Sequence, residues 1–113
     1  MFTLYGFALL SSVAAFATDA EATRVNYSNC LTDFTVEHLD LKSSSNVFKK
    51  AAPSACANER SAMLAAIKKD EKQFGSSEAE ATEFATEEVD GVLQSFVDGY
   101  SGYLSSSTKP VKS

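Results

Sequence analysis

The sequence is poor in the side chains that bind metal ions or transfer protons. It contains one histidine and two cysteines among 113 residues, and no tryptophan. Metal sites need several ligands at matching spacing, and the sequence has no calcium loop of the Asp-x-Asp-x-Asp-Gly type. No Ser-His-Asp or Cys-His arrangement can be assembled from it either. We therefore predict a protein without catalytic residues, metal or cofactor, which is not an enzyme.

Positive charge is also scarce. The net charge is −5, which argues against nucleic acid and against an anionic membrane surface as binding partners. The charges are segregated along the chain, because residues 42–72 hold seven bases and three acids, whereas residues 78–98 hold seven acids and no base. If these two segments are neighbouring helices, their surfaces are complementary in charge.

The first 17 residues carry no charged side chain. An apolar run around Phe7 to Leu10 is followed by Ala15-Phe16-Ala17, the small-x-small pattern that precedes signal-peptide cleavage. A retained anchor is the alternative, but the uncharged stretch is shorter than the ~20 apolar residues of a spanning helix. We predict a signal peptide at residues 1–17, a periplasmic or secreted protein, and no membrane insertion after cleavage.

The two cysteines, Cys30 and Cys56, are separated by 25 residues. Redox motifs place two cysteines much closer together, so we favour a structural disulfide over a redox or metal role. An exported protein meets oxidising conditions in which such a bond persists. For a domain of this size, one disulfide contributes a large share of the net stability.

Apolar residues recur at helical spacing in three stretches, and no convincing strand alternation or internal repeat is present. The first stretch runs from about residue 20 to 41. The second begins near Ser45, is kinked or split at Pro53, and then continues through Cys56 to about Phe74. The third begins at Ser77, where Ser77-Glu78-Ala79-Glu80 matches a capping box.

These patterns predict an all-α fold, a small bundle of three main helices with one disulfide. Gly75 suits the left-handed position after the second helix, and the short connection makes the second and third helices antiparallel. Gly91 lies inside the third helix, so either a neighbouring helix approaches closely there or the helix is locally weak. We predict a helical domain at residues 18–104 and a disordered tail at residues 105–113.

Two sets of side chains are candidates for function. His38 lies beside Glu37 and could form a pH-sensitive contact, although a partly buried structural histidine is the commoner case. Phe96, Tyr100 and Tyr103 could form a partner surface near the end of the third helix, or they could close the end of the core. The acidic series on the third helix is best explained as a solvated face.

The cysteine segments carry a family resemblance. The order Tyr27-x-x-Cys30, a serine break at residues 43–45, and then Ala55-Cys56-x-x-Glu59 resembles a group of small exported helical proteins of proteobacteria. The resemblance covers about residues 27 to 67 and implies a disulfide-linked helical fold in the cell envelope. Pro53 departs from the smooth helix expected of that group.

The function that these features favour is an exported non-enzymatic interaction or structural module with a protein partner. The first alternative is a periplasmic holdase similar to acid-stress chaperones, because fifteen carboxylates would lose charge on acidification and could expose apolar surface. The second alternative is a small enzyme, which would require Glu37, His38 and an acid of the third helix to converge in a pocket.

Overall fold

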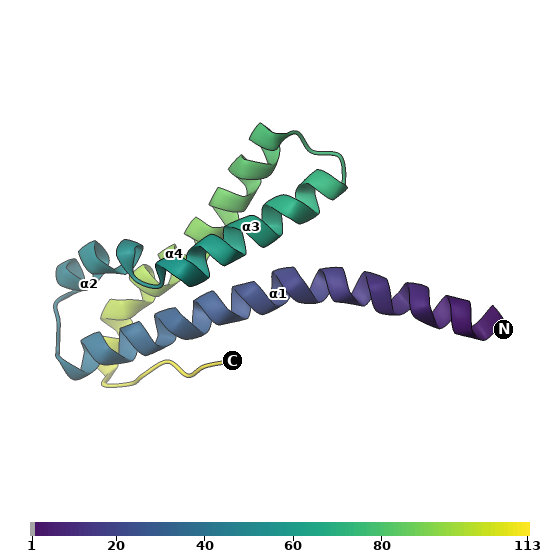
Figure 1. The fold of residues 1–113 in the computed structure, drawn as a ribbon. Helices are drawn as coiled ribbons and strands as arrows, with labels where there is room; N and C mark the ends of the chain where they lie inside the picture. The colour runs from purple at the N-terminus through teal and green to yellow at the C-terminus, as the bar shows by residue number, and fades with distance from the viewer. Residues whose placement is uncertain (1) are drawn as a thin grey trace.

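The fold was analysed in a computed structural model, which describes residues 2–113, with side chains from Asp19 onward. Over that range the chain is all-helical and contains no strand, as predicted (Figure 1). Its elements are α1 (Phe2–Asp40), α2 (Ser45–Ala51), the 3-10 turn η1 (Ala52–Ser54), α3 (Ala57–Gln73) and α4 (Glu78–Ser106). The predicted signal peptide lies outside the residues whose side chains are described.

The prediction of three main helices, the second kinked or split at Pro53, does not match the structure fully. Four α-helices are present among the described residues, because η1 and a turn at residues 55–56 divide the second predicted helix into α2 and α3. Pro53 lies in η1, and Ala55 is extended with a ψ of 148°. Cys56 then adopts the left-handed conformation, with a φ of 58°. A left-handed residue cannot continue an α-helix, so α3 begins only after Cys56.

The predicted capping signals are confirmed. The Ser77 side chain accepts a hydrogen bond from the Glu80 amide at 3.1 Å, and the Glu80 carboxylate accepts one from the Ser77 amide at 3.0 Å. The Ser77 amide lowers the pKa of the Glu80 carboxyl by this hydrogen bond. Gly75 has a φ of 101°, which glycine adopts without strain. These local features place the turn between α3 and α4.

The helices α3 and α4 form an antiparallel hairpin, and α1 packs against both of them (Figure 1). Where α4 passes the end of α1, it also contacts α2 and η1. The core forms two clusters along this arrangement. The first joins α1, α3 and α4 through Tyr27, Leu31, Met63, Ile67, Ala85 and Val89. The second joins α1, α2, η1 and α4 through Leu39, Phe48, Ala52 and Tyr100.

Gly91 faces open space in α4. A Cβ atom built on it meets nothing within 4 Å, so no close helix approach requires glycine there. We expect Gly91→Ala to raise the free energy of unfolding by about 1 kcal/mol, because alanine loses less backbone entropy in a helix. Urea denaturation measures this, with Gly75→Ala as the opposite control, since alanine is strained at its positive φ. A Gly91→Ala protein less stable than wild type would contradict the expectation.

Candidate interaction surfaces

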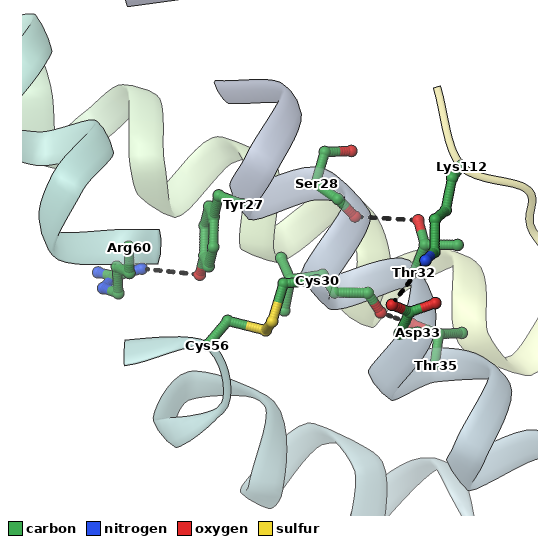
Figure 2. Close-up of a disulfide and its surroundings, with 10 residues drawn as sticks. Tyr27, Ser28, Cys30, Thr32, Asp33, Thr35, Cys56, Arg60 and Lys112 are labelled. Carbon is green, nitrogen blue, oxygen red and sulfur yellow. Dashed lines mark hydrogen bonds and ion pairs between the residues drawn. A yellow bond between two sulfur atoms is a disulfide. The ribbon is translucent and has the colours of Figure 1, made fainter. Parts of the chain in front are cut away.

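The predicted disulfide between Cys30 and Cys56 is present. It joins the C-terminal third of α1 to the residue that precedes the start of α3, and the two Cα atoms lie 6.0 Å apart (Figure 2). Glu59, in the first turn of α3, places a carboxylate oxygen within 4.8 Å of both sulfur atoms. The sulfurs are bonded to each other, so they are not free as metal ligands in this form. The disulfide therefore acts as a covalent link between α1 and the start of α3.

Arg60 connects three helices next to this link. Its Nη1 donates to the Tyr27 hydroxyl on α1 at 3.3 Å, and its Nη2 lies 2.5 Å from Asp90 Oδ1 on α4 (Figure 2 shows the contact with Tyr27). The Tyr27 ring is fully buried beneath it in the first core cluster. This junction fixes the relative positions of α1, α3 and α4.

Tyr100 forms a second junction at the other end of α4. Its ring is fully buried and stacks on Phe48 of α2 with ring centroids 4.2 Å apart. Its hydroxyl lies 2.7 Å from the Ser43 carbonyl oxygen and 3.1 Å from that of His38, so it donates into the turn between α1 and α2. Burial raises the pKa of the Tyr100 hydroxyl, which keeps it a hydrogen-bond donor.

The other candidate residues lie on α1 and α4. Tyr100 closes the end of the core and offers no surface to a partner, whereas Phe96 and Tyr103 are partly buried against the core clusters. His38 Nδ1 lies 2.9 Å from Ser43 Oγ, and its ring packs on Phe34 with centroids 4.4 Å apart. Glu37 is exposed. The polar partner of the imidazole is therefore a hydroxyl, a contact that the charge pattern of the sequence did not indicate.

The end of the α3–α4 hairpin carries a compact ionic cluster. Glu78 at the start of α4 accepts from Lys68 and Lys72 of α3, each at 2.7 Å. The complementary charge of the two segments is thus realised in direct contacts. Lys68, followed by Lys72, lowers the pKa of the Glu78 carboxyl to about 2. Phe74, the residue that follows α3, is 86% exposed.

This cluster has a predictable dependence on pH. The folded pKa of Glu78, about 2, is below the ordinary value of 4.5, so its contribution is complete above pH 4.5 and is lost as pH falls through about 2. We expect the stability difference between wild type and Glu78→Gln to be constant near neutrality and to disappear across that window. Urea midpoints measured from pH 7 to pH 2 test this. Glu83→Gln keeps both lysine contacts and should follow the wild type.

The segment after α4 returns along α1. α4 ends at Ser106, Ser107 turns the chain in a left-handed conformation, and the remaining residues run beside α1 (Figure 1). The predicted tail at residues 105–113 thus contributes its first two residues to α4. The rest contacts three residues of α1, Asn29, Asp33 and Asp40. Together with the exposed Glu37 between them, these residues form what we call the acidic face of α1.

Three contacts hold this segment. Lys109 Nζ lies 2.6 Å from Asp40 Oδ1, and Lys112 Nζ lies 2.9 Å from Asp33 Oδ2. The Ser113 amide donates to Asn29 Oδ1 at 2.9 Å. Figure 2 shows Lys112 reaching Asp33 from the C-terminal segment. Sequence reasoning treated the segment as a tail, although the two lysines near its end were a signal that it could meet an acidic helix face.

A scan against protein-family models returns no match to this chain, and neither do searches of curated proteins and of solved structures. Across the residues that the structure describes, no helix has both the length and the apolar character needed to cross a membrane.

Proposed function

We propose that this chain is an exported, non-enzymatic interaction module that binds a protein partner on the outer surface of its helices. The observation that carries the proposal is the way three helices are locked together. A disulfide and the Arg60 junction join α1, α3 and α4, and Tyr100 ties the far end of α4 to the turn after α1. Rigid surfaces lose less entropy on binding than flexible ones.

Export is supported by the disulfide and by the predicted signal peptide. Oxidising compartments are where disulfides form and persist, and the bond observed joins the two cysteines of the chain. Intact mass spectrometry of the protein from envelope and medium tests this part. We expect a mass beginning at Thr18, with both cysteines alkylated only after reduction. A full-length mass with two free thiols would contradict export.

Partner binding is tested by cross-linking in intact cells. We expect a protein adduct with the wild type, and less of this adduct when Cys30→Ser and Cys56→Ser remove the disulfide. Without the disulfide, α1 and α3 are held together only by the Arg60 junction and the first core cluster, so their surfaces are less rigid. Circular dichroism should first show that the variant is folded at the temperature used. Lys50→Gln, an exposed substitution that leaves the disulfide in place, is the control. Absence of any adduct with the wild type would contradict the proposal.

The acid-stress holdase is less well supported than the interaction module. A holdase active at pH 3 would have to open there. The Cys30–Cys56 disulfide does not titrate and still joins α1 to α3 at that pH. Lys68 and Lys72 also lower the pKa of Glu78 to about 2, so this exposed ion-pair cluster remains paired. We therefore expect no suppression of client aggregation at pH 3. Light scattering of an acid-sensitive client measures this, and clear suppression would favour the holdase instead.

A further inference from the structure

The contact between the C-terminal segment and the acidic face of α1 shows what kind of chain this face accepts. It holds an extended peptide with two lysines, through two ion pairs and one amide hydrogen bond. The three contacts follow one order, because Lys109, Lys112 and Ser113 meet Asp40, Asp33 and Asn29 in turn. The segment therefore runs antiparallel to α1.

The spacing of the charges matches on the two sides. Asp33 and Asp40 are seven residues apart, which is two helical turns and about 10.5 Å along the axis. Lys109 and Lys112 are three residues apart, and an extended chain of the polyproline type covers about 9 Å over three residues. That conformation has three residues per turn, so both lysines lie on one side of it. Pro110 favours it by restricting its own backbone and that of Lys109.

From this match we infer that the acidic face of α1 is a docking surface for an extended segment of a partner protein that carries lysines three residues apart. The C-terminal segment occupies the face in the absence of the partner and is displaced by it. This inference rests on the proposed function and identifies the surface and the chemistry of the partner.

The occupying segment is suited to displacement. All four charged side chains of its ion pairs are more than half exposed, so water and salt weaken the attraction. Val111, between the two lysines, is 87% exposed and adds little apolar contact. The segment retains its place chiefly because it is tethered to α4, which keeps its local concentration high.

A partner protein fits the face better than a second copy of this chain. The tail of a second copy would make the same contacts as the tethered segment and would also lose the entropy of association. A partner with further lysines in the same spacing can add contacts that the segment does not make. Glu37 lies between Asp33 and Asp40 on the exposed side and is available to such a ligand.

The probe for this inference is an N-acetylated synthetic peptide of residues 106–113. Its control is the same peptide with the positions of Val111 and Lys112 exchanged, which places the lysines two residues apart. The receptor is the full chain with Lys109→Gln and Lys112→Gln, labelled with nitrogen-15, in which the native segment no longer competes. Amide chemical shifts report where each peptide binds.

We expect the probe to shift amides at residues 29–40 saturably, and the control peptide to bind less well. The wild type should bind the probe about fivefold more weakly than the receptor variant, because its own segment occupies the face. Adding Asp33→Asn and Asp40→Asn should abolish the shifts. Adding Glu83→Gln and Glu87→Gln on α4, which changes the net charge equally, should leave them in place.

Several results would overturn the inference. These are shifts outside α1, equal binding of the two peptides, or binding that survives Asp33→Asn and Asp40→Asn. A concentration-dependent dimer of the wild type with tail contacts between copies would identify a second copy as the occupant instead. If the peptide does not bind but the protein is still cross-linked to a partner in cells, the partner binds elsewhere on the module. Peptide binding without any cross-linked partner would contradict the proposed function alone.

Discussion

Removal of the disulfide is expected to lower the free energy of unfolding by about 3.5 kcal/mol, as the chain-entropy model gives for a closed loop of this length. The loop runs from Cys30 to Cys56, with a sequence separation of 26. It contains the end of α1, α2 and η1, so the unfolded chain gains the freedom of that whole region. Urea denaturation of the variant carrying both Cys30→Ala and Cys56→Ala measures the change.

The wild type with its disulfide reduced is the comparison for this variant. It removes the cross-link without changing either side chain, so a similar loss in both samples assigns the effect to the cross-link. A loss below about 1 kcal/mol in both would mean that structure in the unfolded state already restrains the loop. The variant should keep its α1–α3 contact through Arg60 and Tyr27, which the disulfide does not provide.

Phe48→Ala is expected to lower the free energy of unfolding by about 3–5 kcal/mol, the range for truncating a buried phenylalanine. Phe48 is the buried residue of α2, a helix of seven residues that is too short to be stable alone. Its ring stacks on Tyr100 and lies 5.6 Å from the ring of Phe34, so the cavity would open between α1, α2 and α4. Thermal or urea unfolding measures the loss.

Val47→Ala is the matched control for that truncation. Val47 is the preceding residue of α2 and is 51% exposed, so its replacement should change stability by less than about 0.5 kcal/mol. If Phe48→Ala also cost so little, α2 would not be packed on the core as the structure shows. Detachment of α2 alone would appear as hydrogen exchange confined to residues near 45–51, with the rest of the chain still protected.

Features with a local cause were predictable from the sequence. The capping box at Ser77 needs only a hydroxyl and a carboxylate three residues apart, and both of its hydrogen bonds are present. The left-handed conformation of Gly75 was also predicted, because glycine is the residue that most readily adopts it after the end of a helix. The disulfide was predicted from compartment and cysteine number, and the antiparallel α3–α4 pair followed from the short connection between them.

The region from Ala51 to Ala57 was predicted less well. The sequence indicates that Pro53 interrupts a helix, but it does not say where the chain resumes one. Cys56 adopts a left-handed conformation that propensity disfavours for a residue with a Cβ atom. The tertiary structure imposes it, since the cysteine must reach Cys30 on α1 while α3 leaves in a different direction. A split at Pro53 was one of the two expected outcomes, and α2 does end at Ala51, but the start of α3 only after Cys56 was not expected.

The candidate surfaces depended on contacts between distant parts of the chain. The sequence shows only that Tyr100 is an aromatic residue near the end of a helix. The packing of the helices decides that it is buried on Phe48 and that its hydroxyl donates to the turn after α1. The sequence pattern indicates that the acidic face of α1 is a solvated helix surface. The return of the C-terminal segment, which brings Lys109 and Lys112 to it, results from the turn at Ser107.

By itself, the sequence determined that this protein is all-helical, where α4 begins, and that α3 and α4 are paired with opposite charges. These properties follow from periodicity, caps and a short connection, which act over a few residues. The tertiary structure alone decided the break at Cys56, the burial of Tyr100 and the occupied acidic face of α1. Each of these requires residues more than 25 positions apart to meet, and helical periodicity carries no information about such distances.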